Sequence, residues 1–386
     1  MREVAILGVG QTAVAEHWDK SLKALAGEAI FEAMRDAGID RGDALYIGNM
    51  LSGTINRQEN SGTLIADWVG LRGIEAMRIE AACGSGAAAL RAGVSAVASG
   101  AMDTVIAVGV EKMTDATSDE LTASLATAAD ADYEAAMGLS FVAINALLMR
   151  RYMHAFGWQH NDFAPFSINA HANAQHNPFA RLRDSISEKD YRRARMIADP
   201  INLLDASPTG DGAAAIVITP VETARKRGNG RPVVTIAASA AATDSIALHD
   251  RHDPMTLAAA KISAERAYAQ AGVGPADIDV FELHDAFSIM AALSLEAAGF
   301  AERGQGPRLG LEGQIGPNGK VPIATMGGLK ARGHPVGATG MYQIVEVYRQ
   351  LIGDAGETQA PDAKIGMAQN IGGSGASVIT HILRAN

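Results

Sequence analysis

The chain has one cysteine, Cys83, in the segment EAACGSGAAAL. It follows an apolar stretch and precedes Gly-Ser-Gly and an Ala-rich run, which we expect to form a buried helix. A helix N-terminus offers unpaired amides and the positive end of the helix dipole, and both stabilise a thiolate. The neighbouring glycines let the backbone approach a bound group closely. This setting suits a nucleophile, although a lone cysteine is also a common small, buried apolar residue.

Two histidines lie in loops that could place them near such a nucleophile. His334 stands in GGLKARGHPVGATG, before a helix expected over 341–351. A histidine held in this loop could act as general base for a thiol, or it could simply cap the helix. His284 and Asp285 directly follow the predicted strand DVFEL. Open α/β sheets bind ligands at the carboxyl ends of their strands, but a structural His-Asp pair would look the same.

Two further groups of residues are candidates for binding substrate. The loop at 370–375, NIGGSG, has consecutive amides that could form an oxyanion hole, although Gly-rich hairpins are common. Arg181 and Arg183 belong to an arginine-rich stretch that could bind a phosphate-bearing ligand or form a solvated helix face. The other histidines show no metal-ligand spacing with carboxylates, so we predict no metal site.

Length and composition limit the class of protein. With 386 residues and 48% hydrophobic residues, the chain can build two or three units with large cores, which excludes wholesale disorder. The 41 glycines are not periodic, which excludes collagen. The net charge of −10 disfavours non-specific nucleic-acid binding. A single cysteine excludes an intramolecular disulfide and a cysteine-rich zinc site, which favours a cytoplasmic location.

The hydrophobic pattern predicts an α/β fold with a mostly parallel sheet. No run approaches the ~20 apolar residues of a membrane span, and MREVAILGVGQT is not typical of a signal peptide. A helix is predicted over 21–37, with Gly38 as its C-cap. Alternating with helices, the predicted strands cover residues 4–9, 44–48, 103–109, 213–219, 233–238, 365–369 and 378–383.

The domain organisation is predicted from a change in the alternation of predicted strands and helices along the chain. Residues 114–200 hold most histidines and aromatics and break the strand-helix alternation, so we interpret them as an inserted lobe. The segment AYAQAGVGPADIDVFELHDAF repeats the pattern of AMRDAGIDRGDALYIGNML, namely a helix, an Ala-Gly-aliphatic cap, Asp and a strand. We therefore predict two copies of one unit. Residues 1–113 with 201–225 form the first half, and 226–386 form the second.

Several motifs together closely resemble the thiolase superfamily. They are VAILGVGQT, EAACGSGAAAL, DGAAAIVI, ELHDAF, GGLKARGHPVGATG and NIGGSGASVITHIL. The resemblance spans nearly the whole chain, and HDAF and NIGGSGA are similar to the archaeal and sterol-carrier-protein-type branch. It implies a duplicated, five-layered α-β-α-β-α thiolase fold with an inserted loop lobe.

The resemblance also implies roles for individual residues. Cys83 matches the cysteine that accepts the acyl group, and His334 matches the histidine that activates it and lines an oxyanion hole. His284 matches a histidine that binds the second thioester oxygen. Gly373, with Gly372 and Gly375, matches the loop whose amide holds the acyl-enzyme oxygen. CoA contacts are expected at Arg181, Arg183, Ala324 and Met326.

One departure concerns the second cysteine that ordinary thiolases use as acid/base. Asn370 stands where one branch has that cysteine, and Ala286 stands where the other has it. An amide cannot exchange a proton at neutral pH. Either His284, His334 or a substrate-bound water then takes this role, or the proton step differs.

The resemblance implies a CoA-dependent acyltransferase of thiolase type, with acyl-CoA as substrate and no tightly bound cofactor. Two alternatives are a thiolase-fold aldolase or lyase acting on CoA esters, and a non-catalytic acyl-CoA-binding subunit. The intact Cys83 and His334 argue against the lyase, and the absence of a second cysteine suits the subunit. The family also implies a homodimer or homotetramer and a small OB-fold, zinc-ribbon partner protein.

Overall fold

The computed structural model describes residues 2–227 and 230–386. Within them, nine strands form one sheet in the order β3-β2-β4-β7-β1-β8-β11-β10-β9, and β5 pairs with β6 separately. The strands are β1 Val4–Gln11, β2 Ala44–Gly48, β3 Glu75–Ile79, β4 Val105–Glu111, β5 Met196–Ala198, β6 Ile201–Asn202, β7 Gly212–Pro220, β8 Val234–Thr243, β9 Val280–Glu282, β10 Ile365–Gly372 and β11 Ser377–Ala385. The helices are α1 Leu22–Ala37, α2 Ser61–Trp68, α3 Ser85–Ser99, α4 Ser118–Ala126, α5 Phe141–Phe156, α6 Ala164–Ala174, α7 Glu188–Arg193, α8 Val221–Arg227, α9 Ala258–Ala271, α10 Ser288–Ala297, α11 Gly306–Leu311 and α12 Thr339–Ile352.

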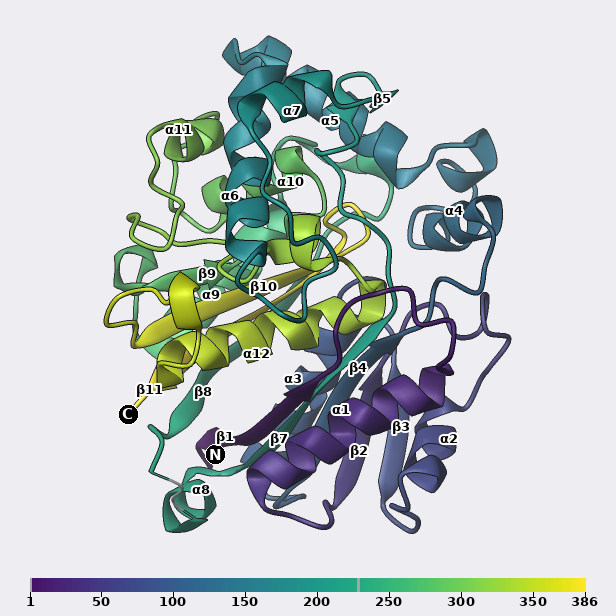
Figure 1. Cartoon of the computed structure of the whole chain (residues 1–386), viewed down its shortest axis with the longest axis vertical. Helices are drawn as coiled ribbons and strands as arrows, with labels where there is room; N and C mark the ends of the chain where they lie inside the picture. The colour runs from purple at the N-terminus through teal and green to yellow at the C-terminus, as the bar shows by residue number, and fades with distance from the viewer. Residues whose placement is uncertain (1, 228–229) are drawn as a thin grey trace.

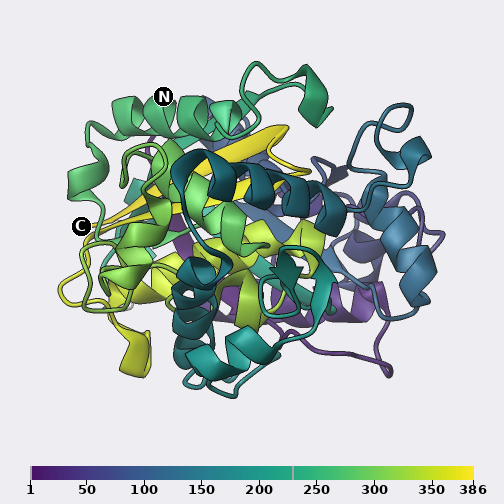
Figure 2. The same cartoon turned by 90° about the horizontal axis from the view of Figure 1, so that it is seen from above.

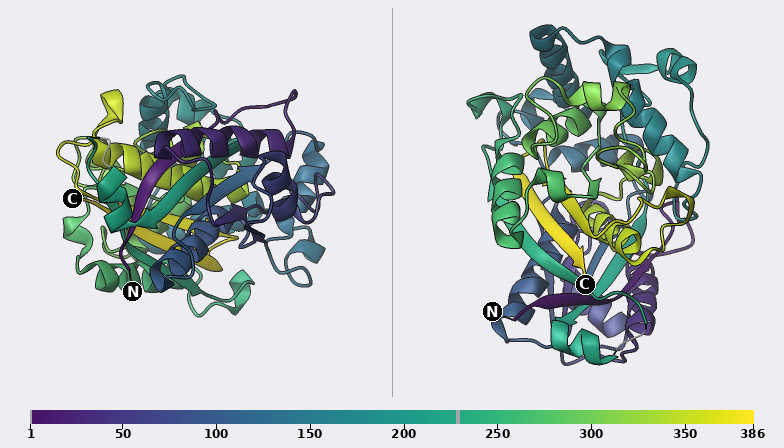
Figure 3. Two further views of the ribbon diagram at one scale, coloured as in Figure 1. Left: turned by 90° about the horizontal axis from the view of Figure 1, so that it is seen from below. Right: turned by 90° about the vertical axis from the view of Figure 1, so that its left-hand side faces the viewer.

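The nine strands form two half-sheets that meet at a single residue pair, Ala5 with Thr235. Helices α1 and α2 pack on the outer face of the first half, and α9 packs on the outer face of the second, with α10 beside α9. Helices α3 and α12 contact strands of both halves and lie between them (Figure 1). Figure 3 shows α1 along the outside of its half of the sheet. These are the five layers of the expected thiolase fold.

The prediction of a mostly parallel sheet is wrong. Among the strands of the described residues, only the pairs β2-β3, β2-β4 and β9-β10 are parallel, and the strands in the middle of the sheet run antiparallel. The strands are covered by helices on both faces, and such strands are continuous apolar runs whatever their direction. Strand direction depends on pairing with distant residues, which the local pattern does not contain.

Local signals fixed the ends of several elements. Ser21 caps α1 by accepting a hydrogen bond from the Ala24 N–H, and Gly38 ends the helix with a left-handed φ of 62°. The predicted strand at 103–109 instead begins at Val105. The reason is that the N–H groups of Asp103 and Thr104 both donate to the Asp43 carboxylate, at 2.8 Å.

Close contact between α3 and the segment leading into α12 positions the loops that follow. A Cβ at Gly86 would lie 2.8 Å from the Gly337 carbonyl oxygen, and one at Gly340 would lie 2.5 Å from the Ala87 amide nitrogen. Only glycine permits this separation. The start of α3 is therefore held against the loop that carries His334.

Residues 114–200 contain α4 to α7, and Figure 2 shows their helices lying over one end of the layered body. Buried polar contacts join this region to the rest. Asp205 Oδ2 lies 2.7 Å from His160 Nε2, and the Tyr191 hydroxyl donates to Oδ1 of the same carboxylate. Lys330 Nζ donates to the Asp205 carbonyl at 2.5 Å. Within the described residues, no helix is long and apolar enough to cross a membrane.

Candidate active site

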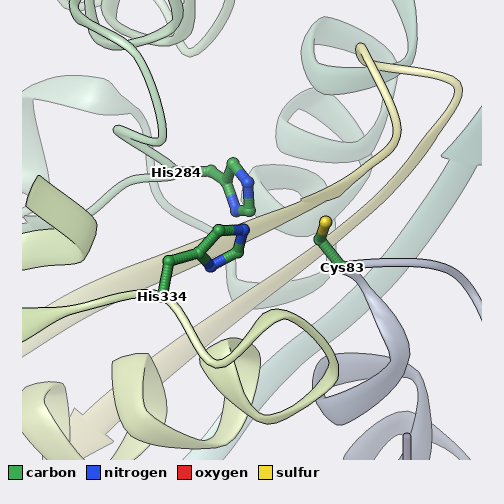
Figure 4. Close-up of side chains that lie close together, drawn as sticks. All are labelled: Cys83, His284 and His334. Atoms are coloured by element: carbon green, nitrogen blue, oxygen red, sulfur yellow. The ribbon is translucent and has the colours of Figure 1, made fainter. Parts of the chain in front are cut away.

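Cys83, His284 and His334 come together from three separate segments (Figure 4). The Cys83 sulfur and one ring nitrogen of each histidine all lie within 4.8 Å of one another. The three residues line a cavity of about 330 Å³, together with Gly373. Much of the remaining wall is apolar and includes Met113, Leu121, Leu125, Phe141, Phe287 and Met290. An apolar cavity with a few convergent polar groups is the usual form of a small-molecule site.

A strained turn places Cys83 at the start of α3. Ala82 has a φ of 52°, a left-handed conformation that is unfavourable for residues other than glycine. The Ser85 hydroxyl holds this turn, because it donates to the Ala82 carbonyl and accepts from the Ala81 N–H. Strain of this kind collects at functional sites, where the surrounding structure maintains it.

The helix N-terminus at Cys83 does not by itself lower the pKa of the thiol. Burial raises the pKa of the Cys83 thiol to about 12, and the nearby Glu111 carboxylate adds to the increase. The amides of Gly373 and Cys83 oppose this but do not overcome it. Glu111 is itself buried and accepts hydrogen bonds from the N–H groups of Met50, Leu51 and Gly337. Cys83 is therefore a neutral thiol that needs a base.

The raised pKa makes a prediction about alkylation. We expect iodoacetamide to alkylate Cys83 slowly at neutral pH, with a rate still rising at about pH 9, where an ordinary thiol levels off. The adduct is measured by intact-mass spectrometry, and it is specific because Cys83 is the only cysteine. The same chain unfolded in urea is the control and should show the ordinary profile. A plateau near neutral pH in the folded protein would contradict a neutral thiol.

His284 is oriented by residues of strand β10. Its Nδ1 lies 3.2 Å from Asn370 Nδ2 and 3.4 Å from the Ile371 N–H, and both of these groups are donors. Nδ1 is therefore the acceptor, and the hydrogen of the neutral ring is on Nε2. Burial lowers the pKa of His284 to about 3, and the Arg332 charge contributes. A neutral imidazole with a fixed N–H can donate a hydrogen bond to a carbonyl oxygen.

His334 lies edge-on to His284, with ring centroids 5.1 Å apart. Its Nδ1 lies 2.7 Å from the hydroxyl of Thr339, the first residue of α12, and its backbone N–H donates to the Pro208 carbonyl. Burial holds the pKa of His334 well below its usual value, and electrostatic interactions with His284 and Arg332 lower it further. A neutral imidazole anchored through Nδ1 leaves Nε2 free to take a proton.

The glycine loop is held by a residue that the sequence analysis did not single out. Arg251 is 6% exposed, its Nη1 donates to the Ser374 carbonyl at 2.6 Å, and its Nε donates to the Ser245 carbonyl at 3.0 Å. The planar guanidinium thus joins the loop at 372–376 to the segment after β8. Gly373 lies next to this contact and supplies the amide that faces Cys83.

Arg251→Lys should therefore misplace the Gly373 amide. One ammonium group cannot reproduce both contacts of the guanidinium fork. We expect kcat of acyl transfer to fall by about tenfold or more with KM little changed, because small displacements of positioned groups are costly. Steady-state kinetics test this, with Arg266→Lys as the control, since Arg266 is exposed and also donates to a carbonyl. A lowered melting temperature with unchanged kcat would rule out the positioning role.

The four predicted CoA contacts do not line the cavity around Cys83. Arg181 pairs with Glu16 at 2.6 Å, and Arg183 is exposed. Ala324 and Met326 are buried. Their carbonyls accept hydrogen bonds from side chains of an asparagine series spaced four residues apart, Asn169, Asn173 and Asn177, which also contacts the Ile323 carbonyl. The four-residue spacing of these asparagines is a signal in the sequence for one polar helix face. A role for these four residues in binding CoA stays a prediction.

The cluster of Cys83, His284 and His334 is also a set of side chains that could hold a metal ion. Zinc takes thiolate and imidazole ligands, and a bound ion would occupy the nucleophile and the base together. We expect added Zn²⁺ to inhibit acyl transfer and a chelator to restore it, as measured by initial rates. Unchanged rates in micromolar Zn²⁺ would show that the three residues cannot close around a cation.

Comparison with known proteins shows the family of this chain. Residues 4–222 match the family described as thiolase, N-terminal domain, and residues 240–385 match the thiolase C-terminal domain-like family. The chain belongs to the thiolase family. An acetyl-CoA acetyltransferase of Methanothermobacter thermautotrophicus is 44% identical to this thiolase over 384 residues, which is 99% of each chain. The benzoylsuccinyl-CoA thiolase subunit BbsB of Thauera aromatica is 30% identical over 96% of this chain and 95% of its own.

Solved structures show the same fold. A structure described as the Ltp2-ChsH2(DUF35) aldolase superposes with a TM-score of 0.86 at 24% identity, over 99% of this chain and 98% of that one. The Acat5 thiolase of Ascaris suum, in complex with coenzyme A, gives 0.73 at 18% identity and covers both chains fully. The predicted fold and the prediction of an acyltransferase of thiolase type are thereby confirmed.

Proposed function

We propose that this thiolase is a CoA-dependent acyltransferase that forms or cleaves a β-ketoacyl-CoA through an acyl-Cys83 intermediate. The observation that carries the proposal is the convergence of the Cys83 sulfur with the ring nitrogens of His284 and His334 in one cavity. Homologues named acetyl-CoA acetyltransferase support CoA esters as the substrate class.

The first half-reaction transfers the acyl group to the enzyme. Cys83 Sγ attacks the thioester carbonyl carbon while its proton passes to Nε2 of His334. A carbon–sulfur bond forms, and the carbonyl oxygen becomes an oxyanion that amide and imidazole N–H donors stabilise. One such donor typically lowers the barrier by about 3–4 kcal/mol. Collapse of the intermediate breaks the bond to CoA, whose sulfur takes the proton from His334 and leaves as the free thiol.

In the second half-reaction a carbanion formed from a second CoA ester attacks the acyl carbon: a carbon–carbon bond forms, the bond to Cys83 Sγ breaks, and the sulfur regains a proton. In the reverse direction Cys83 attacks the β-ketoacyl-CoA, the carbanion leaves and is protonated, and the CoA thiol then takes the acyl group from Cys83. Gly373 and Cys83 supply the amides that we propose for the acyl-enzyme oxygen. His284, a donor through Nε2, serves the oxygen of the second thioester. Asn370 acts behind His284, where its amide orients the ring. We propose that His334 also takes the α-proton of the second CoA ester and returns it to Cys83 Sγ, because no second cysteine exists in the chain.

Intact-mass spectrometry after incubation with acetyl-CoA and then longer or aromatic acyl-CoAs tests the proposal. We expect a mass increase equal to the acyl group, absent in Cys83→Ala. Two assays then test the direction of the reaction. Accumulation of a β-ketoacyl-CoA indicates condensation, and its cleavage when CoA is added indicates thiolysis. Failure of every donor to acylate the folded enzyme would contradict the acyltransferase.

A lyase or a subunit of a complex is the second candidate. Ala286 lines the cavity where one branch of the family carries its second cysteine, so this cavity contains a single thiol. The structural neighbour with a TM-score of 0.86 is an aldolase with a DUF35 partner.

We propose that this chain also assembles as a homodimer or homotetramer in the cytoplasm and accepts a small OB-fold, zinc-ribbon partner. If the isolated chain is inactive and co-expression with such a protein restores activity, the requirement for a partner is supported.

A further inference from the structure

One residue in the wall of the active-site cavity has a buried polar atom with no hydrogen-bond partner among the described residues. Asn145, on α5, is 2% exposed and lines the cavity around Cys83. Its Nδ2 donates to the Phe141 carbonyl at 2.9 Å, while its Oδ1 is buried without a hydrogen bond. The donor contact fixes the amide orientation, because an oxygen placed there would face another oxygen. Among the described residues that line the cavity, Oδ1 of Asn145 is the one buried side-chain atom left unpaired.

An unpaired buried carbonyl oxygen is costly, so its natural complement is a ligand that donates a hydrogen bond. The surroundings indicate which part of a ligand this is. Phe141 and Val142, four and three residues earlier on α5, line the same cavity, and α10 packs against α5 and adds Met290. This stretch of wall fits an apolar group. At about 330 Å³, the cavity has twice the volume that holds benzene in an engineered protein core.

We propose that the acyl group carried by this thiolase is a bulky apolar body bearing a hydroxyl, and that Asn145 selects it by accepting the hydroxyl hydrogen bond. The inference rests on the proposed function, since it names the substrate class of the same site. A site built to bond a hydroxyl discriminates strongly against the analogue that lacks it, because the protein group is then left unpaired. An acetyl group would leave most of this wall uncovered.

Matched CoA esters test the proposal. Phenylacetyl-CoA is compared with its 2-, 3- and 4-hydroxyphenyl isomers in the wild type, Asn145→Leu and Asn145→Ala. Rates of acyl-Cys83 formation are measured by quenched intact-mass spectrometry. We expect at least one hydroxylated isomer to acylate the wild type about tenfold faster than phenylacetyl-CoA. Asn145→Leu should abolish or invert that ratio. The exposed Asn161→Leu serves as the matched control and should keep it.

The ratio within one variant does not depend on how much of the protein is folded, so a partly unfolded variant still gives an answer. A wild type with no preference for any hydroxylated isomer would overturn the proposal. So would a ratio unchanged in Asn145→Leu. Asn145→Leu could instead lower the rate of acyl-Cys83 formation by one common factor for acetyl-CoA and all aromatic esters. The hydrogen-bond donor to Asn145 would then belong to the CoA part of the substrate, and the assignment to the acyl group would be wrong. Absence of any adduct in the wild type would instead contradict the acyltransferase itself.

Discussion

Replacing Cys83 by serine should lower kcat/KM of acyl transfer by about 10⁴-fold or more, because a serine hydroxyl is a far weaker nucleophile at neutral pH. Serine has nearly the same shape, so the strained turn at Ala82 and the contacts of Ser85 should persist. The loss should appear in kcat, since the acyl-enzyme cannot form. It is measured as thiolysis of a β-ketoacyl-CoA at saturating CoA.

The control for this variant is binding rather than rate. Cys83→Ser should still bind acyl-CoA, which calorimetry measures, because the cavity wall is unchanged. His334→Asn provides a second comparison, as it removes the base and leaves the thiol. If Cys83→Ser kept more than about a tenth of the wild-type rate, the reaction would not pass through an acyl-cysteine, and the lyase would become the better interpretation.

Replacing Arg332 by methionine should lower the free energy of unfolding by about 3–5 kcal/mol, the usual loss when one member of a buried ion pair is removed. Arg332 Nε lies 2.9 Å from Glu346 Oε1, and their side chains are 0% and 1% exposed. The guanidinium also lies over the Tyr342 ring, at 4.9 Å. Its Nη1 and Nη2 have no hydrogen-bond partner among the described residues. Urea-induced unfolding at fixed protein concentration measures the loss.

The size of this loss should depend on pH. Burial raises the pKa of Glu346, so the folded state binds a proton more readily than the unfolded state does. Stability therefore falls as pH rises above the unfolded carboxyl value of about 4.3. Without Arg332 to oppose this, the deficit of Arg332→Met should be larger at about pH 8 than at about pH 5.

The matched control is the double variant Arg332→Met with Glu346→Leu, which removes both charges and should recover most of the stability. Recovery of stability need not recover catalysis, because the Arg332 charge also contributes to the low pKa of His284 and His334. We expect the double variant to fold well while its histidines titrate at higher pH, as NMR would show. A single variant as stable as the wild type would contradict a tightly coupled pair.

The sequence by itself determined the three residues that meet in the site. Cys83, His284 and His334 stand out because glycines, a proline or a strand end flank them, and those features are local. Local features also predicted α1 between Ser21 and Gly38, and β2 over Ala44–Gly48, as the structure has them. The division into halves and lobe stays a prediction from the same patterns.

Only the tertiary structure decided the rest, because it depends on contacts between distant residues. Strand direction follows from pairing across the sheet, which apolar runs do not encode. The raised pKa of Cys83 comes from its burial and from Glu111 at the end of β4, and these outweigh the local helix terminus. Arg251 and Asn145 look like ordinary polar residues in the sequence. Their roles follow from burial. Arg251 is bonded to the Ser374 carbonyl, and Asn145 Oδ1 has no partner among the described residues.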